Sequence, residues 1–367
     1  MKAYHAESAY AGLAAAADAG LSFIEFAHAS VDLLERAIPF DSICIGLADP
    51  ATSLLTSRVM IDLDHADEGI FVQYEYEIPD FNHFADLARQ EVAVGILSET
   101  TAAAGRHSPR QRDYLPPIGL EHELRSAVRS GGRMWGVLTL YRASGRVGFS
   151  PAEARFMHRI ETTVASGLRR GLIASSVDRA STDTAAAVII FDAANQVVSA
   201  TATAEERIAQ LGGNLWTELP TVVQTVAAAA RAHTAGAQQV ANLRLRTRTG
   251  EWLALHGTPI RDRDGLTTQT AVTIETAGPA KIIPLIVAAY GLTDRERDVV
   301  QLVLRGDSTN QIATALHISP YTVQDYLKSV FEKVGVSSRR ELSSRIFFSQ
   351  YTNRFGADIN PDGFFAD

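Results

Sequence analysis

Four short stretches in the last fifth of the chain are the most informative: LTDRE at residues 292–296, GDSTNQIA at residues 306–313, ISPYTV at residues 318–323 and KVGVSSR at residues 333–339. Thr293, Ser308 and Ser338 each stand three residues before a Glu or Gln. That spacing is typical of a capping box, in which side chain and backbone satisfy each other's hydrogen bonds at the start of a helix. The pattern predicts three helix starts within a short segment.

A further helix start is marked by Ser319 followed by Pro320. Pro suits the first helical position because the N–H that it lacks has no partner there. Gly306 and Gly335 are placed to end the preceding helices in the left-handed conformation. Residues 292–345 are therefore predicted to form a compact head of four short helices.

The helix predicted from Pro320 to Val334 has an apolar stripe at helical spacing, namely Val323, Leu327, Val330 and Val334. Its opposite face carries Tyr321, Gln324 and Lys328 in one row. An amide such as Gln324 can read an adenine edge, and Lys328 can reach a guanine edge or a phosphate. Residues 313–319 join this helix closely to the one before it, as a helix-turn-helix requires. The row suits a DNA major groove, although a solvated helix face has the same pattern.

Residues 292–342 resemble the LuxR-type helix-turn-helix of bacterial transcription regulators. The resemblance implies that the third helix enters the major groove and that Lys328 matches a DNA-contacting lysine. Many members carry Lys and His where this chain has Gln324 and Tyr326, and Asp325 adds a negative charge beside them. The predicted DNA-binding residues are Thr309, Asn310, Ser319, Tyr321, Thr322, Gln324, Asp325, Lys328, Lys333 and Arg339.

The charge balance limits how this head can bind DNA. The chain of 367 residues has a formal net charge of −8, and residues 292–345 hold eight Arg and Lys against seven Asp and Glu. A nearly neutral head makes few phosphate contacts and has a shallow salt dependence. We therefore expect two copies to bind together, on an operator of two half-sites.

Residues 1–178 are predicted to form a first sheet domain. Helices are expected at residues 23–38 and after Ser150-Pro151, and strands at residues 41–47, 72–78, 124–129 and 133–141, the last two joined by a turn. The late helix has a stripe of Phe156, Ile160, Val164 and Leu168 that can pair with a second copy. Residues 132–150 are similar to the end of GAF domains. The resemblance implies a ligand pocket or a dimer interface.

Six aromatic and histidine side chains of this domain are candidates for the ligand pocket: Tyr74, Tyr76, Phe81, His83, Phe84 and Trp135. Aromatics that alternate on a strand also suit the packed core of any sheet. Both roles stay open for each of them.

Residues 179–277 are predicted to form a second sheet domain, after a division in the Thr/Ala/Ser-rich stretch around Ser175–Ala187. Strands are expected at residues 186–192, 243–247, 252–256 and 272–274, with helices at residues 204–208 and 222–231. Trp252, Ala254 and His256 share one face of their strand. This part resembles a PAS domain.

The chain lacks the signatures of several other classes. Its one cysteine, Cys44, lies outside the PAS-like part, which excludes a flavin adduct there, and as a small buried strand residue it is not expected to carry a bilin. His83, His122 and His256 could hold haem but are each interpreted as structural. The Gly-x-Ser-x-Gly, His-Glu-x-x-His and phosphate-loop motifs are absent. We expect no enzyme, no cofactor and no metal.

Residues 278–367 are assigned to a linker helix and the head. The apolar linker at residues 280–291 is too short to span a bilayer, which takes about 20 residues, and residues 1–7 lack the layout of a secretory signal. The linker is expected to pack the head against the second domain. These features predict a cytoplasmic protein without membrane contact.

The sequence as a whole predicts an α+β multidomain chain, with two antiparallel-sheet sensor domains followed by an all-α four-helix head. The expected function is that of a homodimeric one-component transcription regulator, which binds double-stranded DNA and an effector of unknown identity. The alternative is a cytoplasmic sensing or scaffold protein whose head binds a protein partner. Asp325 and the nearly neutral head favour that alternative.

Overall fold

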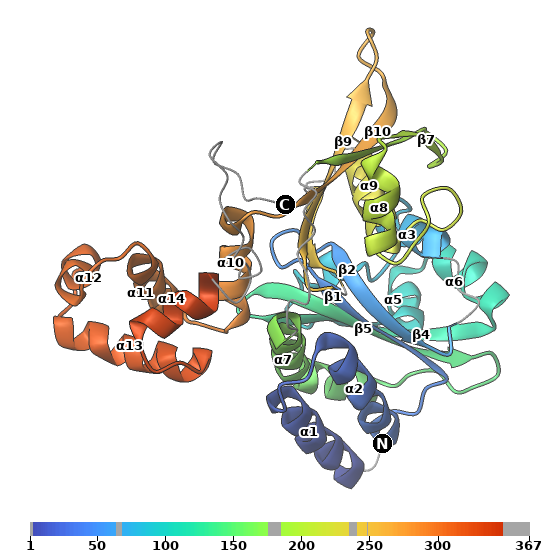
Figure 1. Cartoon of the computed structure of the whole chain (residues 1–367). Coiled ribbons are helices and arrows are strands. Elements are labelled where there is room, and N and C mark those ends of the chain that lie inside the picture. The colour runs from blue at the N-terminus through green and yellow to red at the C-terminus, as the bar shows by residue number, and fades with distance from the viewer. Residues whose placement is uncertain (1–2, 64–67, 175–184, 235–240, 248, 348–367) are drawn as a thin grey trace. The chain divides into compact units, whose positions relative to one another are not determined.

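A computed structural model describes residues 3–63, 68–174, 185–234, 241–247 and 249–347 (Figure 1). It contains two compact units, one with both β-sheets and one with the helices that follow residue 277. Two sheets followed by an all-helical segment confirm the predicted α+β class. Most of the predicted domain division at Ser175–Ala187 lies outside the described residues.

The first sheet has the strand order β2–β1–β5–β4–β3, and its neighbouring strands are antiparallel. Its strands are β1 (Ser42–Ala48), β2 (Leu55–Ile61), β3 (Val94–Ile96), β4 (Leu120–Ser130) and β5 (Arg133–Ala143). The predicted turn between β4 and β5 is confirmed. Gly131 and Gly132 form it with φ of 60° and 71°, the pair of positive angles that a tight hairpin of this type needs.

Helices cover both faces of this sheet (Figure 1). One face packs against α1 (Ala3–Asp18), α2 (Phe23–Ala37) and α7 (Pro151–Ala174). The other face carries α3 (Glu68–Tyr76), α4 (Phe84–Leu87), α5 (Leu97–Ala104), α6 (Pro109–Asp113) and the short 3-10 turn η1 (Pro116–Ile118). The two faces hold separate cores, so a residue's strand position decides which core it enters.

The apolar stripe of α7 is used within the domain. Phe156, Ile160, Val164 and Leu168 are all buried with residues of α1, α2 and the sheet. The prediction that this stripe pairs with a second copy is therefore wrong for these residues, because their own domain covers them. A Cβ at Gly167 would lie 2.2 Å from the Phe26 ring, so a glycine is what lets α2 approach α7 this closely.

The predicted strand at residues 72–78 is wrong, because residues 68–76 form helix α3. Phe71, Val72 and Glu75 are buried, at the spacing of one helix face. The alternation of Val72, Tyr74 and Tyr76 suggested a strand, but Phe71 breaks that pattern and Glu75 is buried with a partner distant in sequence. A run this short does not distinguish the two periods.

The second sheet repeats the strand order of the first, as β7–β6–β10–β9–β8. Its elements are β6 (Ala187–Phe191), β7 (Val197–Ala200), α8 (Thr203–Gln210), α9 (Thr221–Thr234), β8 (Asn242–Arg246), β9 (Trp252–Arg261) and β10 (Thr267–Thr276). The strands and helices predicted for residues 186–274 are thus confirmed as elements.

The face of β9 that packs on α9 is the one opposite Trp252, Ala254 and His256. Leu253 and Leu255 join the core under α9, and a Cβ at Gly257 would lie 2.6 Å from the Val226 carbonyl oxygen. The face of Trp252, Ala254 and His256 is the opposite one, and there His256 is exposed. Because Trp252 and Ala254 are also buried, alternation alone could not identify the face that packs on the helix.

The second unit contains five described helices: α10 (Pro279–Ala289), α11 (Asp294–Leu304), α12 (Thr309–Leu316), α13 (Pro320–Val334) and α14 (Arg339–Phe347). Their shared core centres on Val299, Val300, Ile312 and Leu342, and Val287 brings α10 into it. Within this unit the linker helix therefore packs on the head itself. None of the described helices is both long and apolar enough to cross a membrane.

Candidate nucleic-acid interface

Local capping fixes the helix starts of the head. Thr293 Oγ1 and Ser308 Oγ each accept from the backbone N–H three residues on. The side chains of Glu296 and Gln311 accept in turn from the backbone N–H of Thr293 and Ser308, which confirms both capping boxes. Ser319 caps α13 in the predicted way, with Pro next to it. These caps set where α11, α12 and α13 begin.

The predicted box at Ser338 is only half formed. Ser338 Oγ accepts from the Glu341 N–H at 3.2 Å, but the Glu341 carboxylate accepts from the backbone N–H and hydroxyl of Ser337 instead. These bonds lower the pKa of Glu341. The start of α14 is therefore held by two successive serines.

A tight turn joins α12 to α13. His317 ends α12 in the left-handed conformation with φ 55°, and the Ile318 N–H donates to the Ala313 carbonyl oxygen at 3.0 Å. Ser319 then caps α13 at once. Left-handed backbone is unusual for a residue other than Gly or Asn, so the sequence offered no signal for this stop.

Helix α13 has one buried and one exposed face, as predicted. Val323, Leu327, Val330 and Val334 are buried in the head core. Tyr321 is 74% exposed, and Gln324, Asp325 and Lys328 are exposed beside it. Among the residues that the structure describes, the side chains of Asn310, Tyr321, Gln324, Asp325 and Lys328 form no hydrogen bond or ion pair. They stand free to meet a ligand surface.

Lys333 differs from that group because its ammonium is already bound. Lys333 Nζ donates to both carboxylate oxygens of Glu296, at 2.7 and 2.6 Å, and Ser329 Oγ donates to the same carboxylate at 2.6 Å. Burial raises the pKa of Glu296, but these bonds and the capping bonds from Thr293 outweigh it and lower the pKa to about 2. The carboxylate thus ties α13 to the start of α11.

Arg339 is likewise engaged within the head. Its Nη1 donates to the Asp307 carbonyl oxygen and its Nη2 to Thr309 Oγ1, both at 2.9 Å. The hydroxyls of Ser319 and Thr322 are bonded to each other at 2.9 Å. The ten predicted DNA-binding residues therefore comprise free groups on α12 and α13, bonded groups at the starts of α12, α13 and α14, and the bonded Lys333 in the last turn of α13.

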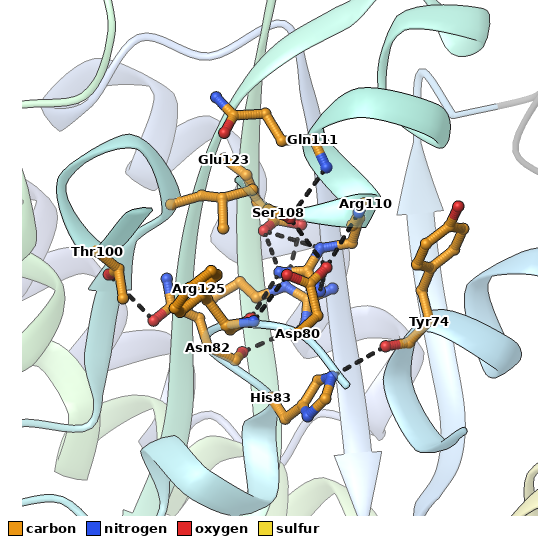
Figure 2. A network of polar contacts seen from close by, with 12 residues as sticks. Tyr74, Asp80, Asn82, His83, Thr100, Ser108, Arg110, Gln111, Glu123 and Arg125 are labelled. Carbon is orange, nitrogen blue, oxygen red and sulfur yellow. Dashed lines mark hydrogen bonds and ion pairs between the residues drawn. The ribbon is translucent and has the colours of Figure 1, made fainter. Parts of the chain in front are cut away.

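In the first sheet domain, most of the ligand-pocket candidates lie around a cluster of buried charges (Figure 2). Arg110 Nη2 donates to Glu123 at 2.9 Å, and its Nη1 lies 3.3 Å from Asp80. Arg125 donates to Glu75 at 2.7 Å and lies 3.0 Å from the second oxygen of Glu123. Each of these side chains is at most 2% exposed. We call these five residues the charge network.

Glu123 lies between the two arginines of the charge network. Burial alone would raise the pKa of Glu123, but the guanidiniums of Arg110 and Arg125 hold it below its ordinary value. Glu123 and Arg125 alternate with Leu124, which enters the opposite core beside α7. The spacing of Glu123 and Arg125, which puts two opposite charges on one face of β4, was the available sequence signal for this network.

Four of the six pocket candidates contact the charge network or its neighbours. The Phe84 ring lies 4.6 Å below the Arg125 guanidinium, and the Phe81 carbonyl oxygen accepts from Arg110. His83 Nε2 is 3.0 Å from the Tyr74 carbonyl oxygen, a bond that Figure 2 shows. The structure brings these four together, on the face of the sheet opposite α7.

The other two candidates lie elsewhere. The Tyr76 hydroxyl accepts from the Leu55 N–H at 3.2 Å. Trp135 is an extra residue at a bulge of β5, where Val128 pairs with Gly136 and Arg129 with Met134. Its ring lies 5.8 Å from the guanidinium of Arg169 on α7. Trp135 therefore does not join the other candidates.

A family model and two known regulators match the head. Residues 291–345 match the family model described as "Bacterial regulatory proteins, luxR family". An HTH-type transcriptional regulator of Mycobacterium tuberculosis is 51% identical over 51 residues, which are 14% of this chain and 6% of that protein. The transcriptional regulatory protein DesR of Bacillus subtilis is 42% identical over 57 residues, 16% of this chain and 29% of DesR.

Solved structures of low similarity also match parts of the chain. The phage VqmA–DPO complex is 21% identical, with a TM-score of 0.22 over 44% of this chain and 79% of that one. The GAF domain of a Coxiella burnetii phosphoenolpyruvate-protein phosphotransferase is 13% identical, with a TM-score of 0.29 over 46% of this chain and 95% of that one.

One relative is matched over most of its length. The spore germination protein GerE of Bacillus subtilis is 38% identical over 50 residues, which are 14% of this chain and 68% of GerE. The chain spans far less of the mycobacterial regulator and of DesR, so the likeness to those two is confined to the head. The match to GerE agrees with the family model and with the geometry of α11 to α14, and the chain belongs to the luxR family of bacterial regulatory proteins.

Proposed function

We propose that this transcription regulator is a cytoplasmic homodimer that reads two DNA half-sites about one helical turn apart. A small molecule bound by the sheet domains supplies the signal. The observation that carries DNA reading is the exposed row of Tyr321, Gln324 and Lys328, whose side chains have no bonds within the described head. A free amide and a free ammonium on one helix face can meet base edges.

The bonded residues have a different role in this proposal. Ser319 and Thr322 lie at the start of α13, and Thr309 lies at the start of α12. Helix starts present backbone N–H groups that favour a phosphate. Arg339 holds Thr309, and Lys333 holds the carboxylate of Glu296, so both fix the positions of helices that carry the contacts.

The weak positive charge of the head favours binding as a pair. Eight Arg and Lys face seven Asp and Glu between residues 292 and 345, so one head attracts phosphates weakly. Two heads on one operator add their contacts, which compensates for the weakness of each.

Selection from a random DNA library with the full-length protein tests the proposal. Lys328→Ala removes one exposed positive charge of α13, and Arg305→Ala removes one at the end of α11, outside the turn. Both variants lose equal charge, but only Lys328→Ala should abolish enrichment of the motif and reduce the salt slope by about 0.9. Equal behaviour of the two variants would exclude a specific role for Lys328.

A second variant tests base readout. Gln324→Ala should relax the preference at one base position by about 1–3 kcal/mol while the rest of the motif is kept. Unchanged preference at every position would remove Gln324 from direct readout.

Binding of a protein partner in place of DNA is the second candidate function. Asp325 and the nearly neutral head favour it, since a carboxylate in the centre of the exposed face repels phosphates. Absence of any enriched DNA, with the full-length chain and with residues 278–367 alone, would support this candidate over the first.

A further inference from the structure

A groove of about 760 Å³ lies within the first unit, between the two sheet domains. One wall is formed by β2 and the start of α3, and the other by β8 and the segment from the end of α8 into α9. Its volume falls in the range of small-molecule sites, about 300–1,000 Å³. A smaller hollow of about 330 Å³ shares Gly69, Thr217, Leu219 and Gln224 with it.

The two domains that form this groove are held together by an ion pair and by side chains of each that are buried in a core of the other. Asp49, which follows β1 and is 1% exposed in its side chain, accepts two bonds from the Arg244 guanidinium, at 2.8 and 2.6 Å. Leu54 is buried in the core of the second domain, and Ala228 of α9 in a core of the first. The groove is therefore preformed, which reduces the entropic cost of binding.

Four charged residues line the groove, and they are Arg58, Arg246, Glu68 and Glu218. Arg58 is the one whose bonds reach both walls. Its side chain is 9% exposed and its guanidinium lies 4.6 Å above the Phe71 ring. Nη2 donates to Thr221 Oγ1 of the other wall at 3.1 Å. Among the described residues, the buried Nε has no hydrogen-bond partner. A buried donor without an acceptor is unfavourable, so this site favours a ligand that supplies one.

The acidic partner of Arg58 is replaceable. Glu68 lies 3.3 Å from Nη2 and its side chain is 42% exposed. Water screens the Glu68 half of this pair, which weakens its hold on Arg58. A ligand carboxylate can accept from the fork of a guanidinium through two oxygens and would take the place of Glu68.

The remaining lining defines the rest of the ligand. Amide and hydroxyl groups come from Gln210, Gln224, Thr56 and Thr217, and apolar surface from Met60, Leu63, Leu219 and Leu245. Arg246 adds a second guanidinium to the same groove, where burial lowers its pKa to about 10. The lining suits a molecule with an acid group, a hydrogen-bonding middle and a short apolar chain.

We propose that the groove between the sheet domains binds a small organic acid, such as an N-acylated amino acid, whose carboxylate replaces Glu68 on Arg58 and contacts Thr221. This site is distinct from the pocket candidates around the charge network. It deepens the proposed function by naming the place and class of the signal, and thus rests on the sensing half of that proposal. Because one carboxylate touches both walls, the ligand bridges the two domains.

Binding to the full-length protein tests the site with two matched probe pairs: N-acetylleucine with N-acetylleucinamide, and N-acetylphenylalanine with its amide. Each pair differs in the carboxylate charge. Ligand-detected NMR titration gives the Kd of each probe. We expect binding of at least one acid and none, or at least about tenfold weaker binding, of its amide. Lack of binding by both acids, or equal binding of acid and amide, would overturn the proposal.

Two variants shift the affinity in opposite directions. Arg58→Gln should weaken binding of the acid by about tenfold or more, since it removes a charge-assisted bond. Glu68→Gln should strengthen it, because it removes the competing carboxylate, whereas Glu35→Gln on the exposed face of α2 should leave it unchanged. Equal affinity of the Glu68 and Glu35 variants would refute the exchange, even if Arg58→Gln failed to fold. DNA selection is independent of these titrations, so failure of one proposal leaves the other standing.

Discussion

The carboxylate of Glu296 offers a sharp test of what holds the DNA-binding head together. Glu296→Gln keeps an oxygen that can accept the Thr293 N–H, so the helix cap survives. The change removes the negative charge that Lys333 Nζ contacts at 2.6 and 2.7 Å. The variant therefore isolates the ion pair between α11 and α13 from the cap.

The expected loss can be worked from the pKa of Glu296. A lowering from its ordinary 4.5 to about 2 corresponds to about 3 kcal/mol of stabilisation of the charged form. The side chain of Glu296 is 5% exposed but that of Lys333 is 36% exposed, so the released ammonium regains water. We therefore expect a loss nearer to about 2 kcal/mol at neutral pH.

The pH dependence has a definite sign. The pKa of Glu296 in the folded head is lower than in the unfolded chain, so its contribution is fully present above about pH 4.5. It is lost as the pH falls toward about 2. The difference between the parent protein and Glu296→Gln should shrink over the same range.

Amide hydrogen exchange of the full-length protein measures the effect locally. Peptides from α11 and α13 should exchange about 30-fold faster in Glu296→Gln, the factor that corresponds to about 2 kcal/mol. Glu332→Gln on the exposed face of α13 is the matched control and should leave exchange unchanged. Equal exchange in the two variants would refute the reasoning.

Three further predictions concern other parts of the chain. Glu75→Gln removes one of the two carboxylates that contact Arg125 in the buried network and should destabilise the first unit by about 3 kcal/mol in denaturant unfolding, and an unchanged midpoint would contradict this. Gly136→Ala places a Cβ 2.2 Å from the Gly46 carbonyl oxygen and should cost about 3 kcal/mol or more by the same assay, whereas wild-type stability would show that the strands can separate there. Asp325→Asn should raise DNA affinity in a fluorescence anisotropy titration, most strongly at low salt, and a decrease would indicate that the carboxylate accepts from a base.

The head was predictable because its signals are local. The caps at Thr293, Ser308 and Ser319 depend on residues within one turn, and the buried stripe of α13 follows from its period. The bond from Lys333 to Glu296 spans 37 residues, so no local pattern indicated that this lysine is already occupied.

Most helices and strands of the sheet domains were predictable, but which of their residues are buried was less so. The Gly131-Gly132 turn identified its hairpin, whereas α3 was assigned to a strand because the burial of Glu75 depends on Arg125, 50 residues away. The groove at Arg58 also has no signature in sequence. Its two walls come from distant parts of the sequence, and Arg58 bonds to Thr221, 163 residues away.

The charge network restricts which substitutions this domain can accept during evolution. Its members come from four separate segments, and bonds join Arg125 to Glu75 and Arg110 to Asp80 across 50 and 30 residues. Loss of one member leaves the net charge of the buried cluster unbalanced, so a single substitution is penalised even where a double one is tolerated. These five positions should therefore be inherited as a block in related chains, either all kept or exchanged together for apolar residues of similar volume.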